Sequence, residues 1–149
     1  DANPVIVNNA LIVTSAVGKI VALDKRSGRR IWINDITSTQ TPLVNGNSIF
    51  VINNNKELFN LYLNNGNIRW KTFIEQKSSQ NYEYIWYAPI LVNDKILLAG
   101  GNNKLLIINS ISGEIEKELS LPDKPASSPF VADKKLYLML RNSDILTIE

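Results

Sequence analysis

An internal repeat is the feature that most constrains what this chain can fold into. Four segments begin with a proline followed by apolar residues: Pro4, Pro42, Pro89 and Pro129. The spacings between successive prolines are 38, 47 and 40 residues. From each of the first three prolines, 24 residues lead to a glycine in a turn-forming sequence: Gly28, Gly66 and Gly113. Self-similarity with a period of about 20–50 residues indicates a repeat architecture.

Each repeat contains short apolar or alternating runs separated by turn residues, which is typical of β-strands. Residues that accept positive φ separate the first two runs: Asn8-Asn9, Asn45-Gly46-Asn47, Asn93-Asp94 and Asp133-Lys134. These pairs predict hairpins. Second strands are then expected at 11–15, 48–52, 95–99 and 135–140. Third strands are expected at 19–24, 57–63 and 104–109, and the turns at the three repeat glycines lead to a fourth strand.

Four antiparallel strands repeated about every 40 residues are typical of propeller blades. A helical solenoid is excluded because no segment sustains an apolar period of about 3.6 residues. We therefore predict an all-β fold, a partial β-propeller of four-stranded antiparallel blades. The predicted blades cover residues 1–39, 40–87, 88–126 and 127–149, and the last lacks its outer strand.

Composition narrows the functions open to the chain. The net charge is +2, from 16 Lys and Arg against 14 Asp and Glu, so nucleic acid is not an expected partner. The sequence has no Cys and no His, which removes disulfides, thiolate metal sites and the commonest general base. No apolar run approaches the ~20 residues of a membrane-spanning helix, and the first four residues do not resemble a signal peptide.

One segment carries a specific motif. Residues 21–32 resemble the tryptophan-docking motif of PQQ-type propellers, Ala-x-Asp-x-x-x-Gly-x-x-x-Trp, at Ala22, Asp24, Gly28 and Trp32. The second repeat retains Gly66 and Trp70 but has Asn60 and Tyr62 at the first two positions. The third retains Gly113, with Ile107, Asn109 and Lys117 elsewhere. An indole from an outer strand is expected to pack between blades and to donate its N–H to a backbone acceptor, so these residues are predicted to be structural.

Two families share this motif: the quinoprotein dehydrogenases and the BamB-type lipoproteins of the outer-membrane β-barrel assembly machinery. The last segment, 128–149, resembles the end of the BamB-type proteins, whose eight-bladed ring is closed by an N-terminal strand. The resemblance implies half of such a ring, a non-catalytic scaffold in the periplasm at the outer membrane, and a barrel-assembly protein as partner. The alternatives are a fragment of a PQQ-dependent quinoprotein dehydrogenase and an extracellular ligand-binding or sensor propeller.

No catalytic, cofactor-binding or metal-binding residue is predicted. A quinoprotein site needs cations for the cofactor's carboxylates, oxygen ligands for Ca²⁺ and an acidic base. The acidic residues are scattered through turns and strand ends, and no pair recurs at a spacing that suggests metal ligation. The cations of segment 25–30 could form a polyanion patch, but the near-neutral chain favours a solvated hairpin.

An insertion marks the candidate partner-binding segment. Trp70 and Pro89 are 19 residues apart, whereas the equivalent Trp32 and Pro42 are 10 apart. The inserted connection carries four aromatic residues: Tyr82, Tyr84, Trp86 and Tyr87. These aromatics predict either a protein-binding surface or a segment that folds back to cap the central channel or to fill an inter-blade groove. The resemblance adds Asp1 as a partner contact, and the open strand edge of the last blade predicts self-association.

Overall fold

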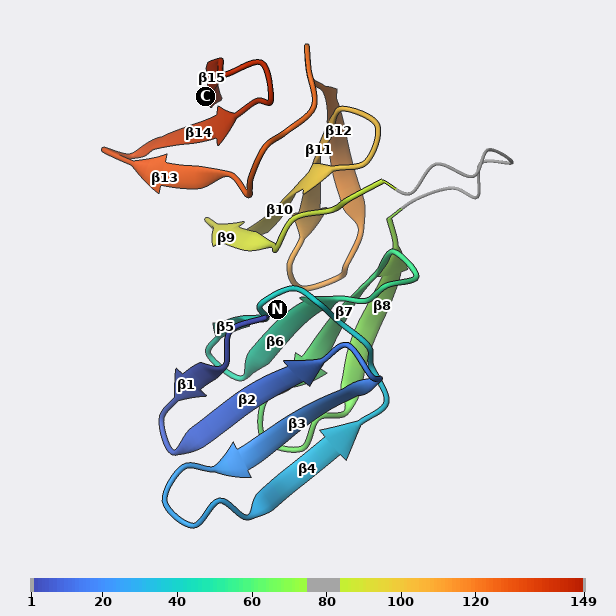
Figure 1. The fold of residues 1–149 in the computed structure, drawn as a ribbon, viewed down its shortest axis with the longest axis vertical. Helices are drawn as coiled ribbons and strands as arrows, with labels where there is room; N and C mark the ends of the chain where they lie inside the picture. Colours follow the sequence, from blue (N-terminus) through green and yellow to red (C-terminus); the bar gives the residue numbers. More distant parts are fainter. Residues whose placement is uncertain (1, 75–83, 149) are drawn as a thin grey trace. The chain divides into compact units, whose positions relative to one another are not determined.

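The computed structural model describes residues 2–74 and 84–148, and the regular secondary structure of these residues is entirely β (Figure 1). Their strands form three four-stranded sheets and one three-stranded sheet, in which each strand pairs antiparallel with its neighbour in sequence. Each sheet is thus one meander, the topology of a propeller blade. No helix long and apolar enough to cross a membrane occurs in these residues.

Strand boundaries follow the predicted repeat closely. The first sheet contains β1 (Val5–Val7), β2 (Ala10–Ser15), β3 (Lys19–Asp24) and β4 (Arg30–Asn34). The second contains β5 (Leu43–Asn45), β6 (Ser48–Ile52), β7 (Glu57–Tyr62) and β8 (Ile68–Phe73). The third contains β9 (Ile90–Val92), β10 (Lys95–Gly100), β11 (Lys104–Asn109) and β12 (Ile115–Ser120). The fourth contains β13 (Phe130–Ala132), β14 (Lys135–Met139) and β15 (Ile145–Ile148).

The hairpins between first and second strands have the predicted chemistry. Asn8 has a φ of 53°, Gly46 of 57° and Asn93 of 48°. In the fourth sheet, Asp133 and Lys134 have φ values of 48° and 62°. Positive φ at two-residue turns matches the right-handed twist of the flanking strands, so Asn, Asp and Gly specify these hairpins locally.

The turn between third and fourth strands has one backbone design in the first three sheets. The amide of the repeat glycine donates to a carbonyl four residues earlier, from Gly28 to Asp24 at 2.8 Å, from Gly66 to Tyr62 at 2.8 Å and from Gly113 to Asn109 at 2.9 Å. The strand register shifts beside each of these turns. Such a bulge bends the fourth strand, and its recurrence shows that the 24-residue interval encodes a common local structure.

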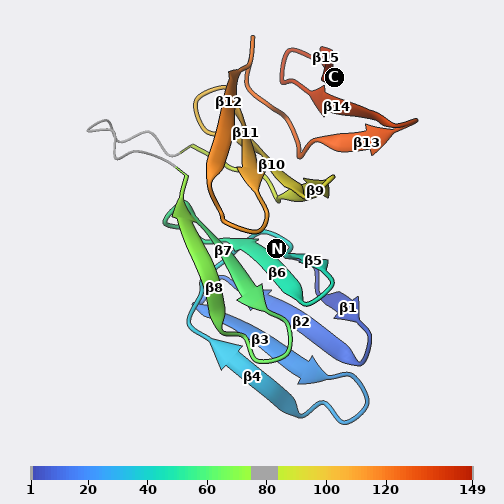
Figure 2. The same ribbon diagram turned by 180° about the vertical axis from the view of Figure 1, so that it is seen from behind.

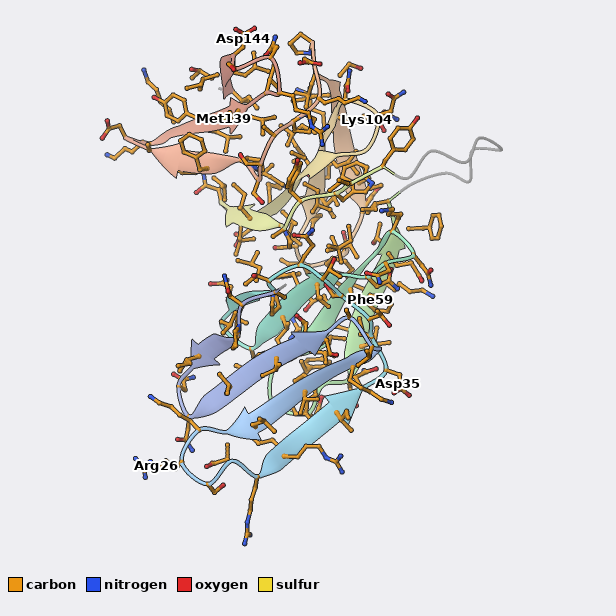
Figure 3. The ribbon with its side chains drawn as sticks, in the orientation of Figure 1. Arg26, Asp35, Phe59, Lys104, Met139 and Asp144 are labelled. Atoms are coloured by element: carbon orange, nitrogen blue, oxygen red, sulfur yellow. The ribbon has the colours of Figure 1, made fainter. Side chains whose placement is uncertain are left out.

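The chain divides into two compact units, residues 1–74 and 75–149, each described here separately. In the first unit, the sheets β1–β4 and β5–β8 pack face to face, as the two opposite views show (Figures 1 and 2). Their shared core takes Ile12, Ile20 and Trp32 from the first sheet and Ile49 and Phe59 from the second. Phe59 lies in β7 (Figure 3).

The second unit has an equivalent core between its two sheets. Leu97, Ala99 and Leu105 of the third sheet pack with Leu138 of β14 and with Leu140, which follows that strand. Each sheet therefore needs a neighbouring sheet to bury its apolar face, as expected of a repeat fold. The prediction of an all-β partial propeller with an incomplete fourth blade is confirmed. The strands lie within the predicted blade ranges of 1–39, 40–87, 88–126 and 127–149.

Candidate functional site

Trp32 lies at the junction of the first two sheets. Its side chain is 8% exposed, and its Nε1–H donates to the carbonyl oxygen of Leu63 at 2.8 Å. The indole covers Gly66, because a Cβ atom placed there would lie 2.5 Å from Cδ2 of Trp32. Asn34 adds a hydrogen bond from Nδ2 to the carbonyl oxygen of Gly66 at 2.9 Å. The outer strand of one sheet thus holds the turn of the next.

Asp24 organises the turn around Gly28. Its Oδ1 accepts hydrogen bonds from the amides of Arg26 and Ser27 and from the Ser27 hydroxyl, and its Oδ2 accepts one from Asn9. These donors, with the Ser27 amide contributing most, hold the pKa of the Asp24 carboxyl below its usual value. The side chain is a local cap for the turn and is not arranged for proton transfer.

Asn109 has the same capping role in the third sheet, although it departs from the motif. Its Oδ1 accepts from the amides of Ile111 at 2.9 Å and Ser112 at 3.1 Å. Both amide and carboxylate side-chain oxygens can accept from backbone amides in such a turn. Tyr62 cannot do this in the second sheet, where Asn65 instead accepts from the amide of Asn67 at 2.9 Å.

The remaining motif residues have different surroundings. Ala22 is fully buried, and Gly113 is buried. Trp70 is half-buried, and its ring centroid lies 6.0 Å from that of Phe50. Gly28 is exposed, and a Cβ atom placed on it would meet nothing within 4 Å. Of the two repeat glycines in the first unit, Gly66 is therefore covered by an indole, whereas Gly28 is not.

The described part of the insertion, from residue 84 onward, pairs with the third sheet. Trp86 forms an antiparallel bridge with Gly100, the Tyr87 amide donates to the Ala99 carbonyl oxygen at 3.0 Å, and the Gly101 amide donates to the Ile85 carbonyl oxygen at 3.1 Å. Trp86 is only 3% exposed, whereas Ile85 is 53% exposed. The connection therefore anchors itself through Trp86.

Gly100 and Gly101 permit this close approach. Their φ values are 153° and 55°, a region that residues with a side chain rarely adopt. A Cβ atom on Gly100 would lie 2.7 Å from Cα of Trp86, and one on Gly101 would lie 2.5 Å from Cζ2 of the Trp86 ring. The double glycine thus sets the position of the connection relative to β10.

A hollow with a volume of about 210 Å³ opens beside this connection, between the third and fourth sheets. It is lined by Tyr84, Ile85 and Tyr87 of the connection and by the cations Lys124 and Arg141. Both tyrosines are half-buried, and both cations are exposed. In the first unit, a second hollow of about 330 Å³ is lined by asparagines and apolar residues, with no charged side chain.

Two of the predicted partner contacts, Asp1 and Tyr82, lie outside the described residues. Tyr84 and Tyr87 both line the hollow, whereas Trp86 is buried against the third sheet. The sequence reasoning did not single out Gly100, Gly101, Lys124 or Arg141. The Gly-Gly pair at the end of a strand was the available signal for a close backbone approach. No sequence pattern pointed to Lys124 and Arg141 as neighbours, because they are 17 residues apart in the sequence.

No catalytic constellation is found in the described part of the chain. Groups of three or more acidic residues close enough to bind a metal ion do not occur in residues 2–74 and 84–148. Lys71 and Lys95 instead pair with Glu57 and Glu116, which lowers the pKa of both carboxyls. Residues 25–30 are exposed at the turn after β3, where Figure 3 labels Arg26.

A family model described as outer membrane protein assembly factor BamB matches residues 1–148. The assembly factor BamB of Escherichia coli strain K12 is 24% identical over 149 residues, which are 99% of this chain and 36% of that protein. The assembly factor BamB of Legionella pneumophila is 24% identical over 143 residues, 95% of this chain and 35% of that protein. The chain thus spans about a third of the length of these relatives.

Solved structures show the same fold. The crystal structure of BamB from Moraxella catarrhalis matches with a TM-score of 0.70 at 20% identity, over 87% of this chain and 43% of that chain. A quinohemoprotein alcohol dehydrogenase from Pseudomonas putida matches with a TM-score of 0.76 at 17% identity, over 93% of this chain and 28% of that chain. At these identities the likeness concerns the fold alone.

Proposed function

The chain belongs to the family of the outer membrane protein assembly factor BamB, and on that premise we propose that it forms part of a non-catalytic, protein-binding propeller that supports outer-membrane protein assembly. The match of the family model over residues 1–148 is the observation that carries this proposal. It spans every blade of the chain, so it does not rest on a single motif.

The proposed partner is a barrel-assembly protein of the outer membrane, and the proposed location is the periplasmic side of that membrane. The arrangement of the connection 84–87 supports a binding role. Two half-buried tyrosines and the exposed Ile85 are held on a backbone anchored by Trp86. Aromatic side chains on a rigid support offer contact area at a small cost in conformational entropy.

A quinoprotein dehydrogenase is the second candidate, because the Pseudomonas putida enzyme shares the fold. Its chemistry requires oxygen ligands for Ca²⁺ and an acidic base. In the described residues, the carboxylates with lowered pKa are engaged by Lys71, Lys95 or a turn amide, which leaves them unsuited to act as a base. The family match over residues 1–148 therefore carries more weight, and it favours the non-catalytic scaffold.

The proposal is tested in cells that carry the full-length protein. Deleting it should lower the amount of folded barrel protein in purified outer membranes, measured by heat-modifiable migration on gels, and re-expression should restore it. Unchanged barrel protein levels after deletion would refute the assembly function. Photo-crosslinkers at Tyr84 and Tyr87 should capture the partner, with an equivalent crosslinker at exposed Lys117 as the control position.

The enzyme alternative has a direct test on the isolated chain. A ligand that binds the native state raises the melting temperature, and the rise grows with ligand concentration. We expect no change in the melting temperature when the quinone cofactor and Ca²⁺ are added together. A concentration-dependent rise of several degrees would favour the dehydrogenase and count against a pure scaffold.

A further inference from the structure

We propose that the hollow between the third and fourth sheets binds a carboxylate on an extended segment of a protein partner. We refer to the hollow as the Tyr84–Arg141 pocket, lined by Tyr84, Ile85, Tyr87, Lys124 and Arg141. The proposal deepens the binding function proposed above and rests on it, because it names the chemistry that one surface recognises.

The pocket is lined by two positively charged side chains. Lys124 and Arg141 belong to neighbouring backbone segments, since the Arg141 amide donates to the Lys124 carbonyl oxygen at 2.8 Å. Within residues 2–74 and 84–148, neither side chain forms an ion pair, whereas Lys19, Lys71, Lys95 and Lys104 each do. Because both cations line the same pocket, a carboxylate bound there would be attracted to both.

The nearby carboxylates have other roles. Asp123 accepts a hydrogen bond from the Asn142 amide at 3.0 Å, and Asp144 accepts one from Asn142 Nδ2 at 2.8 Å. Both bonds hold the turn between β14 and β15, where Asp144 is labelled in Figure 3. Both carboxylates therefore serve the turn, and no acidic side chain is among the described residues that line the pocket.

The pocket is small. A volume of about 210 Å³ is below the range of about 300–1,000 Å³ that accommodates small-molecule ligands, so the pocket suits one or two side chains. The 53% exposed Ile85 at its edge can contact an apolar residue beside the carboxylate. The aromatic rings of Tyr84 and Tyr87 provide apolar area against which an extended peptide segment can pack.

Backbone bridges fix the segments that line the pocket. The bridge between Trp86 and Gly100, and the burial of the Trp86 ring on Gly101, hold one wall of the pocket in place before any ligand arrives. Lys124 and Arg141 flank a second bridge, between Pro125 and Leu140, which fixes their backbone. A preformed pocket binds with a smaller loss of conformational entropy than a flexible one.

The experiment uses the 149-residue chain and short fluorescent peptides. The first peptide is Gly-Ser-Ile-Glu-Ser-Gly with an amidated end, and the second replaces its Glu with Gln. A third has the Gln sequence with a free terminal carboxylate. Binding is measured by fluorescence anisotropy at low salt, and its position by the amide NMR shifts of Gly100 and Gly101.

We expect the Glu peptide or the free-acid peptide to bind at least tenfold more tightly than the Gln amide, with shifts at both glycines. The tighter of the two identifies a side-chain or a terminal carboxylate as the source. Lys124→Gln and Arg141→Gln should each weaken binding about fivefold, as for an exposed ion pair. Lys135→Gln changes an exposed lysine of β14 that does not line the pocket, and it should leave binding unchanged. Circular dichroism should show that all three variants remain folded.

Three outcomes would overturn the proposal. Equal binding of the Glu and Gln peptides would show that the carboxylate is not recognised. Binding to vesicles of anionic phosphatidylglycerol without binding to any peptide would indicate a lipid surface instead. Unchanged shifts at Gly100 and Gly101 with millimolar peptide would place binding elsewhere. These results are independent of the barrel-protein levels in cells, so failure of the pocket and failure of the assembly function can be told apart.

Discussion

Replacing Trp32 with alanine tests how the first two blades hold together. The substitution removes an indole that is 8% exposed and leaves a cavity above Gly66. Truncation of a buried Trp to Ala costs about 3–5 kcal/mol. The lost hydrogen bond to the Leu63 carbonyl oxygen is part of that cost, and about 1 kcal/mol is its ordinary share. Trp32→Phe retains a ring without the donor and should cost about 1–2 kcal/mol.

The partner substitution makes the test sharper. Gly66→Ala places a Cβ atom against the Trp32 ring at a φ of 72°, whereas Gly28→Ala has nearly the same φ, 71°, and nothing within 4 Å. The left-handed backbone alone costs about 1–2 kcal/mol, so Gly28→Ala should lose that amount. Gly66→Ala should lose about 1–3 kcal/mol more, because the added methyl overpacks the junction. In the Trp32→Ala background, that additional cost should disappear.

Urea denaturation followed by far-ultraviolet circular dichroism measures all of these changes, because the signal does not depend on the Trp that is removed. A cost of Trp32→Ala below about 1 kcal/mol would refute the role of the indole as a junction between blades. Equal costs for Gly66→Ala and Gly28→Ala would refute the steric reasoning, even if Trp32→Ala itself were destabilising.

Three further predictions concern other sites. Gly101→Ala should lower stability by about 2–4 kcal/mol in the same urea assay, because it combines a φ of 55° with a clash against Trp86; a loss below about 1 kcal/mol would contradict the packing argument. The pKa of Asp24 is lowered from 3.8 in the folded chain, so its stabilising contribution is full above about pH 4 and is lost as pH falls through the folded value. Melting temperatures measured between pH 5 and 2 should therefore fall less steeply for Asp24→Asn than for the unmodified chain, and parallel profiles would argue against it. Asn60 is fully buried, and among the described residues neither its Nδ2 nor its Oδ1 has a hydrogen-bond partner, so Asn60→Ala should keep or raise stability by about 1 kcal/mol; a loss above about 2 kcal/mol would show that the amide is satisfied in solution.

Local structure was readable from the sequence because its causes are local. Positive φ at Asn8, Gly46 and Asn93 depends on residue type, and alternating apolar runs place strands wherever two such turns bound them. The expected third strand at 57–63 ends at Tyr62, a difference of one residue. The blade count and the incomplete fourth sheet followed from the same periodicity.

The docking motif predicted the roles of individual side chains less completely than the repeat predicted the strands. It treated the third repeat as retaining Gly113 alone, yet Asn109 caps its turn as Asp24 does in the first, because an amide oxygen accepts the same hydrogen bonds. It also placed Trp86 with the tyrosines of the connection as a candidate partner contact. The structure buries that ring against Gly101, a contact that depends on how the chain returns to β10.

The sequence by itself determined the strands, the turns and the repeat, since each depends on neighbours within a few residues. Tertiary structure alone decided the Tyr84–Arg141 pocket. Lys124 and Arg141 become neighbours through a backbone hydrogen bond between distant segments, and Tyr84 and Tyr87 reach them because two glycines let the connection lie against β10. Neither pair of neighbours follows a repeat in the sequence, because both arise from the packing of one blade beside the next.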